Sequence, residues 1–150
     1  MCYHLTMAKR IILDTNVLVS ALTSAEGTSR TVLREVLQGR WQALISLSLF
    51  LEYEDVLARP QTIARCPLPK AEQEALIDAF ASRCQMIELH DMWRPNLRDE
   101  ADNHVFELAV AAQDAVLLTW NLRDFASAEL RFPHIRVLTP AQWLASEKGE

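Results

Sequence analysis

Short apolar runs alternate with segments of helical periodicity along almost the whole chain, and this alternation limits the fold more than any other feature. The runs are nearly continuously apolar, so a strand formed by any of them has to be buried on both faces. Strands of that kind are typical of a parallel sheet covered by helices. We therefore predict an α/β fold, a three-layer α/β/α sandwich around a central, mainly parallel sheet. The predicted strands are residues 11–14, 43–47, 86–89, 115–119 and 135–138.

The segments between these runs carry helix start and stop signals. Gly39 is expected to end the second helix, and Ser48 is expected to cap the next one. Pro140 stands at the first turn of a closing helix, where proline is tolerated. Residues 60–69 contain three prolines and are predicted to be a link. The predicted helices are residues 16–22, 28–39, 48–59, 70–82, 98–112, 121–125 and 140–144.

Length and composition are those of one globular domain. The chain has 150 residues, half of them apolar, and a formal net charge of −5, which is ordinary for a single soluble domain. We expect an N-terminal extension at 1–8, one domain at 9–146 and a C-terminal tail at 147–150. The acidic balance argues against a broad basic face for nucleic acid, although it leaves local basic patches open.

The sequence contains no signal for membrane insertion or secretion. Residues 43–51 are its longest apolar stretch and include two serines, whereas a membrane-spanning helix needs about 20 apolar residues. The first seven residues lack the basic start, apolar core and cleavage site of a secretory signal. We therefore expect a cytoplasmic protein.

Cysteine, histidine and tryptophan carry no metal or cofactor signal. The cysteines lack CxxC spacing and are interpreted as reduced thiols. The histidines lack metal-ligand spacing, so we predict that they lie on the surface or in loops. The tryptophans are scattered, which favours anchors in the core or an interface over a base-stacking platform. These residues are Cys2, Cys66, Cys84, His4, His90, His104, His134, Trp41, Trp93, Trp120 and Trp143.

Polar side chains directly follow two of the predicted strands. Asp14 follows the apolar residues 11–13, and Thr119 and Asn121 follow residues 116–118. In an open parallel sheet, ligands bind outside the carboxyl ends of the strands. These side chains are therefore the first candidates for a functional site.

Three carboxylates are candidates for a shared metal site. Asp14 follows a strand, Glu52 lies on a predicted helix, and Asp102 lies with Asp99 at the start of the helix before the fourth strand. If Asp14, Glu52 and Asp102 converge, their mutual repulsion calls for a hard divalent cation, Mg²⁺ or Mn²⁺. Such a cation leaves coordination positions for a phosphate oxygen and a water, so the cluster predicts a phosphodiester hydrolase.

Structural roles explain the same carboxylates without a metal. Asp14 fits a turn or cap residue, and Glu52 fits a solvent face that also carries Glu54 and Asp55. The acids at 99–102 match a helix start that interacts favourably with the helix dipole. The residues alone leave these alternatives open.

Four segments in combination resemble one known family. They are DTNV at 14–17, SLSLFLEYEDVL at 46–57, RDEADN at 98–103 and LTWN at 118–121. Together they resemble the PIN domain family, and more narrowly its branch of VapC-related toxins from toxin–antitoxin systems. The resemblance extends from Arg10 to Leu144.

The resemblance implies a metal-dependent endoribonuclease that acts as the toxin of a toxin–antitoxin pair, with Mg²⁺ or Mn²⁺ as cofactor. Asp14, Glu52 and Asp102 match the catalytic acids of the family. Asp99 matches a further acid common in this branch, so the implied metal ligands are Asp14, Asp102 and Asp99.

The resemblance also names supporting residues and one departure. Asn16 and Thr119 match polar residues that support the site by hydrogen bonding. Asn121 stands where many relatives carry a fourth Asp, and its neutral amide removes one negative charge, so a second metal ion is expected to bind more weakly. Asp124, three residues further on, is a candidate to compensate for that charge.

The implied partners are an RNA substrate, a small cognate antitoxin and a second copy of the chain in a homodimer. Arg30, Arg34 and Arg123 are candidates for guiding the RNA backbone into an acidic cleft. They are equally compatible with ordinary surface charges.

Two other functions stay open on the sequence. One is a catalytically weakened PIN-fold module that binds RNA or protein, which Asn121 favours and the intact Asp14, Glu52 and Asp102 disfavour. The other is a hydrolase of small phosphate esters with Asp14 as the nucleophile. Such enzymes usually carry a second Asp two residues further on, where this chain has Asn16.

Overall fold

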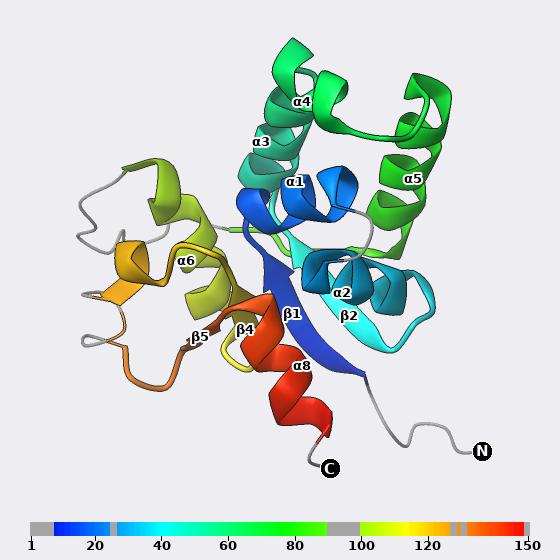
Figure 1. The fold of residues 1–150 in the computed structure, drawn as a ribbon. Coiled ribbons are helices and arrows are strands. Elements are labelled where there is room, and N and C mark those ends of the chain that lie inside the picture. The colour runs from blue at the N-terminus through cyan, green and yellow to red at the C-terminus, as the bar shows by residue number, and fades with distance from the viewer. Residues whose placement is uncertain (1–7, 25–26, 90–99, 127–128, 130–131, 149–150) are drawn as a thin grey trace.

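Helices and strands alternate along the chain in the computed structural model (Figure 1). The structure describes residues 8–24, 27–89, 100–126, 129 and 132–148, without the side chains of 100–103. The elements, in chain order, are β1 (Lys9–Leu13), α1 (Thr15–Thr23), α2 (Thr28–Leu37), β2 (Trp41–Ile45), α3 (Leu47–Leu57), α4 (Pro60–Arg65), α5 (Lys70–Arg83), β3 (Gln85–Met86), α6 (Glu100–Ala112), β4 (Val116–Leu118), the 3-10 helix η1 (Leu122–Phe125), β5 (Arg136–Leu138) and α8 (Pro140–Lys148).

The strands of the described chain form one five-stranded sheet in the order β3-β2-β1-β4-β5. Each neighbouring pair is parallel, and Ile11 of β1 lies beside Ala43 of β2 and Val116 of β4. Ile11, Ile12 and Leu13 are fully buried, as expected of a strand that helices cover on both faces. The predicted parallel α/β fold is confirmed.

Helices cover both faces of this sheet. α2 and α8 contact each other and cross in front of it in Figure 1. α6 packs against β4, and the right-handed crossover of parallel strands puts it on the opposite face. An aromatic pair also joins the sheet to a helix. The rings of Trp41 in β2 and Trp143 in α8 pack edge to face, with their centroids 5.0 Å apart. The result is the predicted three-layer α/β/α sandwich.

Helix α3 begins earlier than the sequence pattern predicts. Its N-cap is Ser46, whose hydroxyl oxygen accepts a hydrogen bond from the backbone N–H of Leu49 at 3.2 Å. The prediction that the strand continues to Leu47 and that Ser48 caps the helix is therefore wrong. Leu47 is 62% exposed and has no place in a buried strand. Ser46 directly follows the last strand residue, so its hydroxyl reaches the free N–H groups of the first turn.

Two further differences lie between α3 and α6. The stretch predicted as a link contains α4, with Pro60 in its first turn, where the missing N–H of proline costs no hydrogen bond. β3 covers only two residues and begins one residue before the predicted strand. The backbone N–H of Ile87 still donates to the carbonyl of Ile45 at 2.8 Å, so pairing with β2 continues one residue further.

Smaller expectations agree with the structure where it describes them. Gly39 follows α2 with φ +84°, a backbone conformation that favours glycine. Cys66 and Cys84 are free thiols, and burial raises the pKa of Cys84 to about 12, which makes it unreactive. Cys2 lies outside the described residues. Within the described chain, none of the helices combines the length and the apolarity that crossing a membrane requires.

Candidate functional site

The strand order reverses between β1 and β4, because β2 and β3 extend the sheet on one side of β1 while β4 and β5 extend it on the other. At such a switch point the connections leave toward opposite faces and open a crevice at the carboxyl ends of the strands. Asp14 follows β1 and Thr119 follows β4. The backbone N–H of Asp14 donates to the carbonyl of Leu118 at 2.9 Å, so the two polar residues lie at the same edge.

Asp14 is a buried carboxylate on which several donors converge. It is 4% exposed. Its Oδ1 accepts from the backbone N–H of Thr15 at 2.8 Å, which makes it the N-cap of α1. Its Oδ2 accepts from the hydroxyl of Thr119 at 2.8 Å and from Nδ2 of Asn16 at 3.3 Å. Burial raises the pKa of Asp14 although the hydrogen bonds from Thr119 and Thr15 oppose that rise.

Glu52 of α3 lines the same crevice. The hydroxyl of Thr15 donates to its Oε2, and its Oε1 lies 2.7 Å from Nε2 of His104. Burial alone would raise the pKa of Glu52, but the hydrogen bonds from His104 and Thr15 outweigh burial and hold the pKa below its usual range. Glu54 and Asp55 are exposed, so Glu52 does not share their solvent-facing side of the helix.

His104 is a part of this site that no sequence pattern indicated. It lies on α6 with 17% of its side chain exposed, so the prediction of a surface or loop histidine is wrong. Its contact with Glu52 joins residues far apart in the chain, which no local spacing reveals. Asp102 precedes His104 by two residues on α6. The side chain of Asp102 and the whole of Asp99 lie outside the described residues.

A cleft of about 640 Å³ opens beside these carboxylates. Asn121 and Asp124, both predicted to support the site, line it together with Asn16. The Nδ2 of Asn16 donates to the hydroxyl oxygen of Thr119 at 3.3 Å, and its Oδ1 accepts from the backbone N–H of Trp120 at 3.0 Å. The backbone N–H of Asn121 donates to the same hydroxyl oxygen at 3.0 Å. Asn16, Thr119 and Asn121 therefore gather around Asp14, and Asp124 lines the same cleft.

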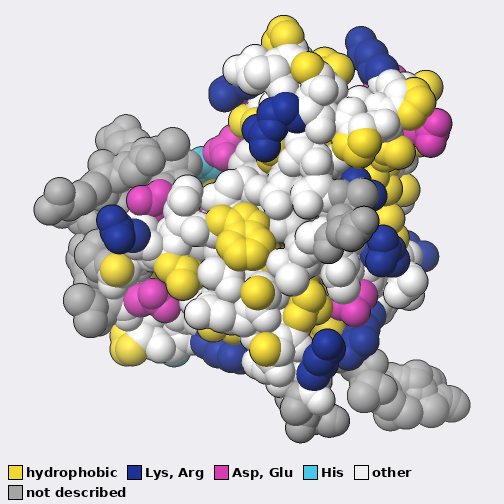
Figure 2. All heavy atoms as spheres, in the orientation of Figure 1, with side chains coloured by type: hydrophobic (Ala, Val, Ile, Leu, Met, Phe, Trp, Pro, Cys, Tyr) yellow, Lys and Arg dark blue, Asp and Glu magenta, His cyan; other side chains and the backbone are white. Residues whose placement is uncertain are grey.

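The arginines named as RNA guides lie in different environments. Arg30 donates to two carbonyl oxygens in the last turn of α1, so its guanidinium is engaged within the fold. Arg34 and Arg123 are exposed. Arg65, which the sequence did not single out, lines the cleft. On the face drawn in Figure 2, Lys and Arg side chains are scattered and form no continuous basic stripe.

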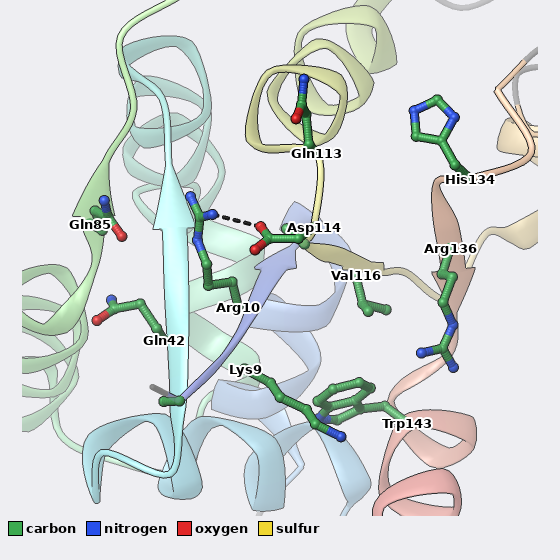
Figure 3. Close-up of a pocket in the computed structure, with 12 residues that line it drawn as sticks. Lys9, Arg10, Gln42, Gln85, Gln113, Asp114, Val116, His134, Arg136 and Trp143 are labelled. Carbon is green, nitrogen blue, oxygen red and sulfur yellow. Dashed lines mark hydrogen bonds and ion pairs between the residues drawn. The ribbon is translucent and has the colours of Figure 1, made fainter. Parts of the chain in front are cut away.

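A larger hollow of about 770 Å³ lies at the other edge of the sheet, where the strands begin (Figure 3). Arg10, Arg136 and His134 line it. Asp114 is the one acid among its described lining residues, and its Oδ1 accepts from Nη1 of Arg10 at 2.6 Å. Because this carboxylate is already paired, the hollow does not compete with the carboxyl edge as a cation site.

The donors at the carboxyl edge suit a hard divalent cation. Asp14, Glu52 and Asp124 offer carboxylate oxygens and Asn121 offers an amide oxygen, and oxygen ligands are those that Mg²⁺ prefers. Among the described side chains, acids, histidines and cysteines nowhere assemble in a group of three that would hold a metal. The raised pKa of Asp14 fits a cation at this edge, because a cation would stabilise its charged form.

The fold and the cleft define a class of protein, a parallel α/β/α sandwich with carboxylates at its switch point. A family profile described as "PIN domain" matches residues 10–123, and the chain belongs to the PIN domain family. A similar solved structure is "Crystal structure of VapBC2 from Rickettsia felis bound to a DNA fragment from their promoter". It aligns with a TM-score of 0.53 and 18% identity over 85% of this chain and 96% of that one, which supports the fold. The search of curated proteins finds no match.

Proposed function

We propose that this protein is a Mg²⁺- or Mn²⁺-dependent endoribonuclease and the toxin of a toxin–antitoxin pair. One observation carries the proposal. The backbone N–H of Thr15 donates to Asp14 and its hydroxyl donates to Glu52, so both carboxylates lie in one cleft at the switch point. Burial, and to a smaller extent the negative charge of Glu52, raises the pKa of Asp14, and a bound cation would favour the charged form of Asp14. Membership of the PIN domain family and the fold shared with VapBC2 support the same function.

We assign Asp14, Asp102 and Asp99 as metal ligands, and Asp14, Glu52 and Asp102 as the catalytic acids. A bound cation would neutralise the carboxylates, polarise the scissile phosphate and acidify a bound water. Asp102 lies at the start of α6, and Asp99 lies in the segment before it. The contact between His104 and Glu52 supports the assignment, because it brings that end of α6 to the cleft.

The chain itself holds the two described carboxylates in place. The Thr119 hydroxyl and the Thr15 N–H fix both oxygens of Asp14. The Thr15 hydroxyl and His104 fix both oxygens of Glu52. In the proposed reaction, water adds to the phosphorus and the bond to the 3′ oxygen breaks, which leaves a 5′-phosphate and a 3′-hydroxyl.

The decisive experiment is cleavage of a mixed structured RNA pool by the purified protein, with Mn²⁺ or Mg²⁺, with chelator, and with Asp14→Asn as the control for contaminating nuclease. Cleavage that requires both the metal and Asp14, with 5′-phosphate ends on the products, would support the proposal. Metal-bound protein that retains RNA without cutting it would favour the weakened PIN-fold module, for which Asn121 in the cleft is the observation.

The toxin assignment has its own test. Induced expression is expected to arrest the growth of a bacterial host, and co-expression of the small protein encoded beside the gene is expected to restore growth. The Asp14→Asn protein, expressed to the same level, should leave growth unaffected. Light scattering on the purified chain tests the proposed homodimer separately.

Asn121→Asp is expected to tighten Mn²⁺ or Mg²⁺ binding about tenfold, because it adds a carboxylate to the cleft that Asn121 lines. Titration calorimetry on both proteins measures the change. Gln85→Glu is a matched control, since it adds the same charge beside the hollow at the opposite edge of the sheet. Equal affinity in Asn121→Asp and the unchanged protein would refute the placement of Asn121 near the metal.

A further inference from the structure

Trp120 differs from the other described tryptophans. Trp41 and Trp143 are 6% and 1% exposed and pack on each other in the core, as the sequence led us to expect of anchors. Trp120 is 41% exposed. It also directly follows Thr119, whose hydroxyl donates to the buried Asp14 carboxylate. An exposed indole therefore stands beside the candidate site.

Both N–H groups of Trp120 are hydrogen-bonded within the protein. Its backbone N–H donates to Oδ1 of Asn16 at 3.0 Å, and its indole Nε1 donates to Oγ of Ser29 at 2.9 Å. Ser29 is 1% exposed and lies in the first turn of α2. The indole is thus held at both ends, and what it presents to solvent is aromatic carbon. A ring fixed in this way loses little conformational freedom when a ligand covers it.

The surroundings of Trp120 suit a small flat ligand. The other large apolar side chains exposed in the described chain are Leu47 and Leu51 on α3 and Met86 on β3. Of these, Met86 lies on the far side of β1 from β4, because β3 flanks β2. Trp120 is instead bonded to Asn16 and followed by Asn121, which are polar and line the cleft. One aromatic face among polar groups matches a nucleobase better than the apolar surface of a protein.

We propose that Trp120 is a stacking platform for a nucleobase of single-stranded RNA bound in the cleft. The inference rests on the proposed ribonuclease function and adds a base-binding subsite to it. Asn16 links the carboxylate to Trp120, because its Nδ2 donates to Asp14 Oδ2 and its Oδ1 accepts from the backbone N–H of Trp120. Both Asn16 and Asn121 line the cleft, so Trp120 stands at its rim, where a base of an RNA held at the carboxylates would stack on the indole. Stacking of this kind tolerates any base, because every base has a π face.

The test is a binding experiment that does not depend on cleavage. Fluorescence anisotropy with a labelled eight-nucleotide RNA, with Ca²⁺ in place of Mg²⁺ so that a cation is present while cleavage is suppressed, compares the unchanged protein with Trp120→Ala, Trp120→Phe and Met86→Ala. Trp120→Ala is expected to weaken binding about 5- to 150-fold, the range for one stacked base. Trp120→Phe, which keeps a ring but loses the indole N–H, should lose clearly less. Met86→Ala removes an apolar side chain of similar exposure on β3 and should change nothing.

A second arm separates stacking from a structural effect of the substitution. A set of RNAs with one abasic position each is titrated against the unchanged protein and Trp120→Ala. One abasic position is expected to weaken binding to the unchanged protein and to have no effect on Trp120→Ala. Abasic sites that weaken both proteins equally would overturn the proposal. The same single-stranded sequence as DNA reports whether the subsite distinguishes the two sugars.

The outcomes distinguish this proposal from the proposed function. Unchanged RNA affinity in Trp120→Ala, together with cleavage that still requires metal and Asp14, would overturn the platform and leave the nuclease standing. Trp120 would then be a contact for a protein partner. Absence of RNA binding by the unchanged protein, together with absence of cleavage, would overturn both.

Discussion

Asp14→Asn is expected to reduce metal-dependent RNA cleavage by at least about 100-fold while the fold stays intact. Asparagine has the shape of aspartate, and its Oδ1 can still accept from the N–H of Thr15, so α1 keeps its cap. What disappears is a buried negative charge at the switch point. Cleavage assays with Mn²⁺ or Mg²⁺ measure the loss, and circular dichroism checks the fold. Full activity in a folded Asp14→Asn protein would remove Asp14 from the catalytic site.

The same variant is expected to gain heat stability in chelator. Burial raises the pKa of Asp14, so the folded state binds the proton more tightly than the unfolded state, whose pKa is about 4. The stability that this protonated group contributes is complete below the unfolded pKa and declines as the pH rises toward the raised folded value. Asparagine does not titrate, so its advantage in Tm should grow as the pH rises from about 4.

Metal reverses this comparison. If the proposed site binds Mg²⁺ in the folded wild type, the metal is expected to raise its Tm, while Asp14→Asn should gain much less. Thermal melts at several pH values, with and without Mg²⁺, measure both effects on the same samples. A Tm advantage of the variant that shrinks with rising pH in chelator would contradict the cause given for the raised pKa.

The residues of this site that directly follow a strand are predictable from the sequence. Asp14 and Thr119 come immediately after buried apolar runs, and the carboxyl ends of parallel strands meet at one edge of a sheet. The chain therefore brings these two side chains together wherever the rest of it packs. Asn16 lies two residues after Asp14, and Asn121 lies two residues after Thr119. The same reasoning therefore places both asparagines near this edge of the sheet.

Residues on helices are not predictable in this way. Which side of α3 faces the crevice depends on its packing against α1 and α6, and those contacts are distant in sequence. The residues alone left Glu52 open as a solvent-face acid like Glu54, and only the family resemblance favoured it as a catalytic acid. His104 was missed because its partner lies on another helix. The exposure of Trp120 likewise depends on Ser29 of α2, which no pattern near residue 120 reveals.

Thr119→Val is expected to lower cleavage about 10- to 100-fold, the usual effect of removing a residue that orients a metal ligand. Thr119 is fully buried, and valine has nearly its shape without the hydroxyl. The substitution removes the hydroxyl that donates to Asp14 and that accepts from the backbone N–H of Asn121. The hydrogen bond from Thr119 lowers the pKa of Asp14, so its loss raises that pKa further and makes Asp14 a poorer ligand at a given pH.

Two readouts identify Thr119 as a positioning residue for Asp14. The acidic limb of the pH–activity profile, taken at subsaturating Mg²⁺, should move to higher pH in Thr119→Val, because Asp14 then binds its proton more tightly. Thr119→Ser keeps the hydroxyl and should restore both the rate and the profile, although it lacks the methyl group that packs at the end of β4. A stability loss of about 1–3 kcal/mol in the valine variant is expected from the unpaired N–H. If activity fell with an unmoved pH profile, and serine failed to rescue it, Thr119 would act through the fold and not through Asp14.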